Sequence, residues 1–277
     1  ADIRTKFITP NIIAAGWNVD SQIREEVFFT DGRIYVRGKL HTRGTKKRVD
    51  YILYYKPNVP IAVIEAKDNN HAINAGIQQA LGYANTLDIP FVFSSNGDGF
   101  LLHDKTNSSG AIESEIPLTA FPSPDELWRK YKKFKGIPDE MDAVVSQDYF
   151  SDGSNRAPRY YQQIAINCTV EAIAKNEGNN RHLLVMATGT GKTRVAVSIC
   201  ELLTRSNWAK RILFLCDRRE LRKQADDVFK DFLPAAPRTI VSSRTAGDRD
   251  KRVYLATYPA MMQIFETFDV GFFDLVI

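Results

Sequence analysis

The spacing of hydrophobic residues changes several times along the first half of the chain, and each change marks a new element. Apolar residues near helical spacing predict a helix over 3–16, ended by Gly16, and Ile73, Ile77, Leu81 and Ala84 form one apolar face of a helix over 71–88. Apolar or alternating runs predict strands over 33–38, 49–55, 60–67 and 90–97. A Gly- and Lys-rich segment, 42–48, predicts a hairpin tip.

A polar stretch around 146–158 separates this half from a second pattern. Beyond it, short apolar runs predict strands over 182–188, 211–217, 252–258 and 272–277. Amphipathic segments between them predict helices over 160–176, 192–205, 218–232 and 259–267. Because strands that alternate with helices form parallel sheets, the second half is predicted to be a parallel α/β domain. The predicted organisation is a first domain over 1–145, a linker over 146–158 and a second domain over 159–277.

Composition places the chain among ordinary globular proteins. It has 277 residues, of which 44% are hydrophobic and 25% charged. No apolar run approaches the length of a membrane span, and the first residues do not resemble a signal peptide. Three scattered cysteines exclude a disulfide framework or a zinc site and are expected to be reduced. The chain begins with Ala1 rather than Met, which indicates a processed terminus or an excised fragment.

Basic residues are clustered although the net charge is only +4. Seven lysines and arginines lie between Arg33 and Arg48 without an intervening acid, and "RKYKKFK" (129–135) interleaves five basic residues with aromatic ones. Such clusters fit the phosphate backbone of a nucleic acid. A solvated surface is the simpler explanation of either cluster taken alone.

The segment "MATGTGKT" (186–193) joins a predicted strand to a predicted helix. Gly189 and Gly191 allow the backbone to bend so that several N–H groups converge, and the helix that follows adds the positive end of its dipole. Lys192 would reach the β- and γ-phosphates of a nucleotide, and the Thr193 hydroxyl would bind Mg²⁺. The general P-loop pattern has a glycine where this chain has Met186. The segment is expected to bind ATP through its remaining residues: Thr188, Gly189, Thr190, Gly191, Lys192 and Thr193.

A second constellation begins with a glutamate and a lysine, Glu65 and Lys67, at the end of an apolar strand. Side chains two apart on a strand point to the same face, and opposite charges at the end of a buried strand are costly unless they are used. If the strand that contains Asp50 is the neighbour of this one, Asp50 joins the pair. Two carboxylates and the Ala66 carbonyl supply hard oxygen ligands for Mg²⁺. The alternative is a structural ion pair.

The second half resembles superfamily 2 helicases and translocases. "RYYQQIAI" (159–166) is similar to their adenine-reading segment, which implies that Gln162 binds the adenine edge and that Tyr160 or Arg159 flanks the ring. "LFLCDRRELRKQA" (213–225) and "YLATYPAM" (254–261) resemble segments that contact nucleic acid, the first through Arg218 and Arg219 and the second through Thr257. The family's Asp-Glu pair would follow Ile277, so this chain is expected not to turn ATP over usefully.

The first half resembles the PD-(D/E)xK nuclease superfamily, with Asp50, Glu65 and Lys67 on the matching positions. The resemblance implies a metal site of Asp50 and Glu65, with Glu26 as a further acid; the neighbouring Glu25 is an alternative. It also implies a Gln-x-x-x-Tyr element, Gln79 and Tyr83, which share a helix face at the active site. The expected fold is therefore a restriction-endonuclease-like α/β domain followed by a truncated RecA-like motor domain.

A nuclease module followed by a motor is similar to the N-terminal part of the restriction (motor) subunit of type I restriction enzymes. That resemblance implies Mg²⁺ and ATP as cofactors, double-stranded DNA as substrate, modification and specificity subunits as partners, and a bacterial or archaeal cytoplasm. Two alternatives remain open. One is a helicase-nuclease of DNA repair or recombination, and the other is a non-catalytic DNA-binding scaffold.

Overall fold

The protein is described by a computed structural model that covers residues 3–30, 34–37, 40–43, 46–108, 110–150, 158–175, 178, 181–245 and 247–277. Within 34–37 and 40–43 it describes the backbone alone. The chain divides into two compact units, Ala1–Asp142 and Ala143–Ile277. No helix in the described part of the chain has the length and apolar character needed to cross a lipid bilayer.

A six-stranded mixed sheet forms the centre of the first unit, with the strand order β1-β4-β5-β6-β7-β8. Its strands are β1 (Ile23–Thr30), β4 (Lys46–Lys56), β5 (Val59–Ala66), β6 (Phe91–Ser95), β7 (Gly99–Asp104) and β8 (Glu113–Pro117). Neighbouring strands are antiparallel except for β5 and β6, which are parallel. The sheet places β5 in its interior, and the run from Ile61 to Glu65 is buried without interruption.

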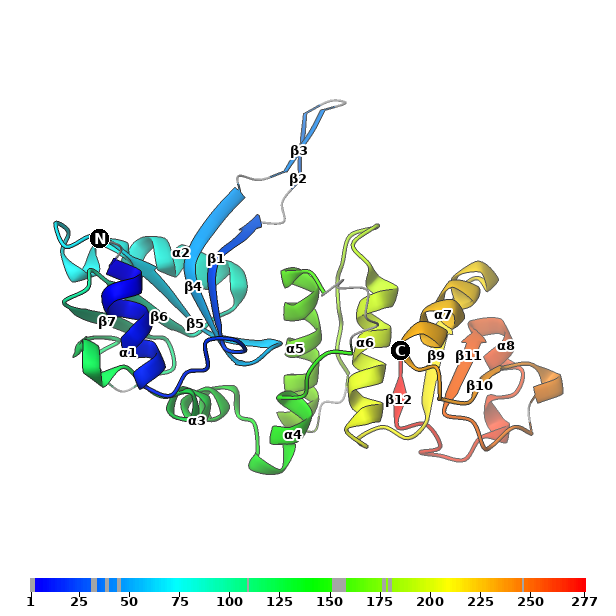
Figure 1. Cartoon of the computed structure of the whole chain (residues 1–277). Helices are drawn as coiled ribbons and strands as arrows, with labels where there is room; N and C mark the ends of the chain where they lie inside the picture. Colours follow the sequence, from blue (N-terminus) through cyan, green and yellow to red (C-terminus); the bar gives the residue numbers. More distant parts are fainter. Residues whose placement is uncertain are drawn as a thin grey trace. The chain divides into compact units, whose positions relative to one another are not determined.

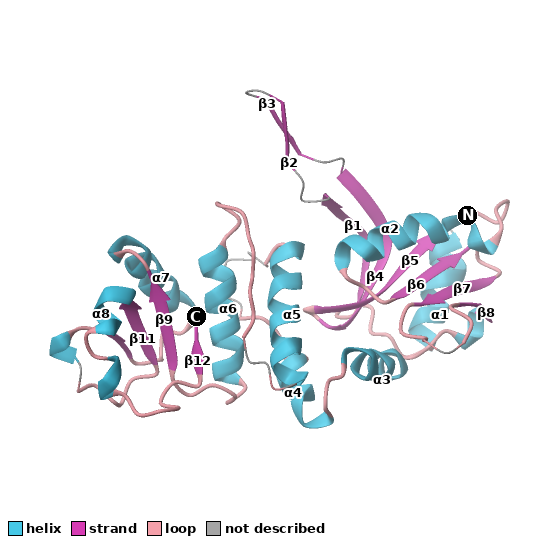
Figure 2. Cartoon of the chain, turned by 180° about the vertical axis from the view of Figure 1, so that it is seen from behind, coloured by secondary structure: helices cyan, strands magenta, loops and turns pink. Residues whose placement is uncertain are grey.

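Helices cover both faces of this sheet (Figures 1 and 2). The turn η2 (Ile73–Gly76) and α2 (Ile77–Leu87) lie against one face, which confirms the helix predicted over 71–88. The other face is covered by η1 (Arg4–Ile8), α1 (Thr9–Ala14) and α3 (Pro124–Lys135). The sequence of α3 explains its limits, because Ser123 and Glu126 form a reciprocal capping box and Gly136 ends the helix at φ 68°.

The predicted hairpin lies one strand earlier than expected. Strands β2 (Ile34–Arg37) and β3 (Leu40–Arg43) pair with each other in a separate two-stranded sheet. Part of the segment 42–48 therefore ends β3, its residues 46–48 already belong to β4, and residues 44–45 lie outside the described residues. The segment 42–48 therefore does not join two paired strands as predicted, because β2 pairs with β3 and not with β4.

The second unit contains a parallel sheet with the strand order β10-β11-β9-β12. Its strands are β9 (Ile212–Cys216), β10 (Arg238–Ile240), β11 (Val253–Thr257) and β12 (Leu275–Val276). Its helices are α5 (Tyr160–Lys175), α6 (Lys192–Arg205), α7 (Arg219–Phe232) and α8 (Tyr258–Met262), and α4 (Asp142–Val145) spans the division between the units. An alternating pattern of strands and helices thus gives the parallel α/β domain that was predicted.

The strand predicted over 182–188 is wrong. No strand forms there: the segment pairs with none of the described strands, and Leu183 and Val185 are 90% and 87% exposed. An apolar run becomes a strand only where a neighbour pairs with its N–H and C=O groups and covers its side chains. Both are lacking here within the described residues.

Part of the predicted linker is attached to the second unit. The Tyr149 hydroxyl donates to Asn167 Oδ1 over 2.6 Å, and the Phe150 ring lies 5.5 Å from that of Phe232. The remaining linker residues, 151–157, lie outside the described residues.

Candidate functional site

The pairing of β4 with β5 brings the two carboxylates of the first site together. Tyr51 lies opposite Ile64, so the same antiparallel register puts Asp50 opposite Glu65. Asp50 Oδ2 accepts the N–H of Ala66 over 2.8 Å, which fixes the orientation of that carboxylate. Asp50 and Glu65 are only 9% and 3% exposed. The two predicted acids therefore meet at the end of a buried strand.

Lys67 connects this pair to helix α2. Its ammonium group donates to Glu65 Oε1 and to Gln79 Oε1, each over 3.0 Å. Gln79 Nε2 in turn donates to the Tyr83 hydroxyl over 2.6 Å, as i,i+4 neighbours on a helix can. One chain of hydrogen bonds thus joins four of the predicted site residues, and Asp50 stands beside it. Gln79 and Tyr83 hold the lysine from the helix side.

Sequence reasoning missed two residues that support Glu65. A side chain at Gly76 would bring its Cβ within 2.9 Å of both Glu65 Cγ and Ser94 Oγ, so only glycine allows η2 to approach the sheet this closely. The Ser94 hydroxyl accepts the Gly76 N–H over 3.1 Å and donates to Ile73 O over 2.6 Å. The glycine in "INAG", just before a helix, is the one signal that could have indicated a close approach.

Electrostatics make Glu65 the perturbed acid of the site. Burial, and after it the neighbouring Asp50, raise its pKa to about 7, although Lys67 and the more distant Arg48 act in the opposite direction. Within the described residues Glu65 Oε2 is buried and has no hydrogen-bond partner. A buried acceptor of this kind, next to a second carboxylate, fits a hard divalent cation such as Mg²⁺. The residues present are therefore compatible with the metal that the resemblance implied.

The two candidate accessory acids differ in position. Glu25 bonds with Thr9 Oγ1, which also contacts the Tyr51 hydroxyl, and so belongs to the face opposite Asp50. Glu26 lies at the position opposite Asp50 in the β1–β4 register, with an unusual φ of 51°. Among the described residues no three acidic, histidine or cysteine side chains are gathered closely enough to hold a metal ion. A metal-binding role of Glu26 therefore remains a prediction.

The loop before α6 has the geometry of an anion-binding turn. Gly189 and Gly191 adopt φ values of 78° and 85°, conformations that favour glycine, and α6 begins directly after them at Lys192. The Lys192 ammonium donates to the carbonyls of Ala187 and Met186 over 3.2 and 3.4 Å, on the loop itself. Converging backbone N–H groups, a helix N-terminus and a lysine are the features that a nucleotide's phosphates require.

Gln162 on α5 is hydrogen-bonded to this loop. Its Nε2 donates to Thr190 O over 2.8 Å, and its Oε1 accepts the N–H of Arg159 over 2.9 Å. A Cβ at Gly191 would lie 2.5 Å from Gln162 Nε2, so glycine is needed there for the contact as well as for its φ. Gln162 therefore lies directly against the loop that was predicted to bind phosphate.

The residues expected to contact nucleic acid lie at one edge of the parallel sheet. Thr257 ends β11 and pairs with Cys216 at the end of β9, after which come Arg218 and Arg219. The carboxyl ends of parallel strands are the usual location of ligand sites in such sheets. The basic helix α3 differs, because three of its lysines form ion pairs with acids of the same unit: Lys130 with Asp104, Lys132 with Asp139, and Lys135 with Asp88. A structural role explains these three.

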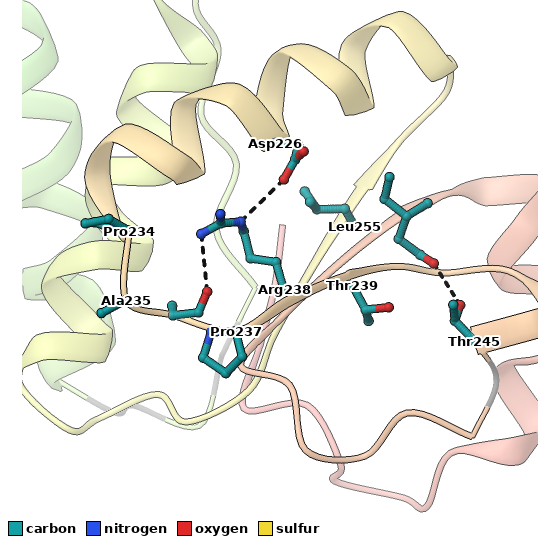
Figure 3. Close-up of a pocket in the computed structure, with 10 residues that line it drawn as sticks. Asp226, Pro234, Ala235, Pro237, Arg238, Thr239, Thr245 and Leu255 are labelled. Atoms are coloured by element: carbon teal, nitrogen blue, oxygen red, sulfur yellow. Dashed lines mark hydrogen bonds and ion pairs between the residues drawn. The ribbon is translucent and has the colours of Figure 1, made fainter.

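An open pocket of about 590 Å³ lies between α7 and β10 (Figure 3). Its two charged lining residues, Asp226 and Arg238, pair with each other, with 3.4 Å between Oδ1 and Nε. Arg238 also donates to Leu233 O and Ala236 O. The two charges of the pocket are thus paired with each other, and none of the predicted site residues lines it.

The fold and the two candidate sites indicate a class of protein in which a nuclease-like domain is followed by a motor-like domain. The first has an acid–acid–lysine site on a mixed sheet, and the second has a P-loop. Family comparisons agree. Residues 21–117 match the model described as "Type I restriction enzyme R protein N terminus (HSDR_N)", and residues 155–277 match "Type III restriction enzyme, res subunit".

Individual relatives lead to the family. The chain is 47% identical over its whole length to the type I restriction enzyme EcoAI endonuclease subunit of Escherichia coli, and 29% identical over 81% of its length to the EcoKI endonuclease subunit of Escherichia coli strain K12. A solved fragment of an HsdR subunit of a type I restriction enzyme from Vibrio vulnificus YJ016 matches 99% of the chain with a TM-score of 0.81 and 36% identity. The chain belongs to the family of type I restriction enzyme endonuclease (R) subunits, as predicted. It spans 35% of the EcoAI subunit, 23% of the EcoKI subunit and 50% of the Vibrio chain.

Proposed function

We propose that this chain carries the Mg²⁺-dependent DNA-cleaving site and part of the ATP-driven motor of a type I restriction enzyme. The observation that supports cleavage most directly is the meeting of Asp50, Glu65 and Lys67, with a buried Glu65 oxygen that lacks a partner. The proposed substrate is double-stranded DNA. The proposed partners are modification and specificity subunits, since the relatives are named as subunits of such enzymes.

In this proposal Asp50 and Glu65 hold the metal, and Glu26 is the further acid that could join them. When bound, the metal would polarise the phosphodiester and lower the pKa of an attacking water. Lys67 lies 3.0 Å from Glu65 and is held by Gln79, so its ammonium is fixed at the metal-binding carboxylate. It can orient the water or offset the charge that develops on the phosphate. Asp50 is kept in position by the Ala66 N–H.

For the second unit we propose ATP binding in the loop 186–193. The N–H groups between Gly189 and Lys192 would bind the phosphates, and Lys192 would exchange its present carbonyl contacts for the β- and γ-phosphates. Gln162 would bind the adenine edge while it remains next to Thr190. The Thr193 hydroxyl would bind Mg²⁺. DNA translocation is the proposed use of this site in the whole protein.

The test uses the full-length subunit assembled with its modification and specificity partners. Lys67→Ala and Asp50→Asn are each expected to abolish DNA cleavage, while ATP hydrolysis and translocation continue. Glu25→Gln is the matched control, because Glu25 lies on the opposite face of the sheet and cleavage should persist. Cleavage retained by Lys67→Ala or Asp50→Asn would refute the assignment and leave the first unit as a DNA-binding scaffold.

A further inference from the structure

Arg48 lies beside the proposed cleavage site although no motif includes it. It precedes Asp50 by two residues on β4, so both side chains belong to the same face of the sheet. Its guanidinium is close enough to act electrostatically on Glu65. The side chain is 52% exposed and therefore accessible from outside the site.

A second arginine, Arg4 of η1, shares a partner with Arg48. Glu26 Oε1 lies 3.0 Å from Arg4 Nη1 and 3.6 Å from Arg48 Nη1. One half-exposed carboxylate oxygen thus stands between two guanidinium groups. Carboxylate and phosphate oxygens offer a guanidinium the same kind of acceptor, so Glu26 occupies a place in which a phosphate would fit.

The backbone at Glu26 indicates that this arrangement is maintained against a cost. Its φ of 51° lies in the left-handed region, which residues other than glycine, asparagine and aspartate seldom adopt. Such conformations persist where surrounding contacts determine them, and they are frequent at functional sites. Glu26 lies opposite Asp50 in the register, and its carboxylate connects Arg4 of η1 to Arg48 on β4.

We propose that Arg48 and Arg4 bind a backbone phosphate of the DNA next to the phosphodiester that is cut, and that Glu26 holds them ready until DNA displaces it. The proposal rests on the nuclease function proposed above. The carboxylates of Asp50 and Glu65 repel DNA when they are ionised, and Arg48 beside them, joined to Arg4 through Glu26, offsets that charge. Glu26 is a positioning residue here, and the two arginines are the groups that contact DNA.

The experiment measures binding without cleavage. A short fluorescein-labelled DNA duplex is titrated with the chain in EDTA, and anisotropy is followed at salt concentrations from about 50 to 200 mM. Arg48→Ala and Arg4→Ala should each weaken binding by about fivefold to tenfold and reduce the salt slope by about one. Arg48→Lys, which keeps the charge, should recover much of the loss.

Lys56→Ala is the control for the arginine variants, because it removes a positive charge at the other end of β4, roughly 26 Å from Arg48; it should have little effect on DNA binding. Glu26→Gln is a further test and should tighten DNA binding several-fold, because it removes the competing carboxylate. Glu25→Gln, on the opposite face, is the control for Glu26→Gln and should not tighten binding. Circular dichroism verifies that each variant is folded.

The proposal is overturned if Arg48→Ala and Arg4→Ala bind no more weakly than Lys56→Ala, or if Glu26→Gln does not differ from Glu25→Gln. Failure of the wild-type chain to bind the duplex at the lowest salt would also overturn it. Asp50→Asn separates this proposal from the nuclease assignment. It should bind DNA in EDTA at least as tightly as the wild type, and in the assembled enzyme it should not cleave. If Asp50→Asn cleaves, the nuclease assignment fails while the phosphate contact can still stand.

Discussion

Replacing Glu65 by glutamine is expected to stabilise the first unit at alkaline pH and to have a much smaller effect at acid pH. Glutamine keeps the shape of a protonated glutamate but cannot ionise. The folded-state pKa of Glu65 is about 7 because burial and Asp50 both disfavour the charged form, while its ordinary value is 4.5. At pH values between 4.5 and about 7, Glu65 is therefore still protonated in the folded chain but already ionised in the unfolded chain.

The sign and size follow from that difference. Since the pKa is higher in the folded state, the stability of the wild type falls as pH rises from about 4.5 through 7. Above about pH 7 the full loss of stability is reached. A difference of roughly 2.5 pKa units corresponds to about 3 kcal/mol, of which about 2–3 kcal/mol develops between about pH 5 and pH 8.5. Glu65 is almost completely buried, so solvent screening reduces this figure little. The variant avoids this loss.

Differential scanning calorimetry at the two pH values is the assay. The advantage of Glu65→Gln over the wild type should grow by roughly 5–10 °C in Tm between about pH 5 and pH 8.5. Comparing variant with wild type at each pH cancels the contribution of all other groups. The two units can unfold as separate transitions, and only the one that contains Glu65 should move.

Repeating the calorimetry with Mg²⁺ provides a second test. A bound cation favours the charged carboxylate, so at about pH 8.5 it should raise the Tm of the wild type and leave that of Glu65→Gln nearly unchanged. Equal shifts at both pH values, or a variant less stable than the wild type at high pH, would refute the electrostatic argument. The buried oxygen without a partner would then need another explanation.

Three further outcomes are expected. Gly76→Ala should destabilise the chain by about 1–3 kcal/mol in urea titrations because its Cβ would lie 2.9 Å from Glu65 Cγ, whereas Gly82→Ala, which meets nothing within 4 Å, should stabilise it slightly. Ser123→Ala should cost about 1 kcal/mol by removing the capping box of α3, again measured in urea. Lys192→Ala should lower the affinity for Mg-ATP about tenfold or more in a fluorescent-nucleotide titration, with Lys210→Ala as control.

Hydrophobic patterns predict some elements of this fold and miss others, including the buried strand β7, over which no element was predicted. β5 is covered on both faces, so its apolar run identifies it directly. β8 at the sheet edge is almost entirely exposed, which removes the alternation that would identify a strand, and it was not predicted. β10, with three residues, is too short to show a period. The segment 182–188 shows the opposite error, because its composition is that of a strand and no described strand pairs with it.

Chemistry at the site was predictable where it depends on spacing along one element. Glu65 and Lys67 share a strand face, and Gln79 and Tyr83 share a helix face, so local geometry places each pair. Asp50 needed only the neighbouring antiparallel strand. Contacts between distant segments were not accessible in this way: η1 meets β4 through Arg4, Glu26 and Arg48, and the sequence contains no periodic signal for that meeting.

The same interactions explain why the site should be reactive and why it weakens the fold. Lys67 donates a hydrogen bond to Glu65, yet burial and Asp50 still raise the glutamate pKa to about 7, so one lysine does not compensate two gathered carboxylates. Arg48 is directed to Glu26 and contributes only at a distance. In the function proposed above, a divalent cation would supply the positive charge that the site lacks, and DNA would bring the phosphate that suits the arginines. A chain that satisfied Glu65 internally would be more stable and would have no use for the metal.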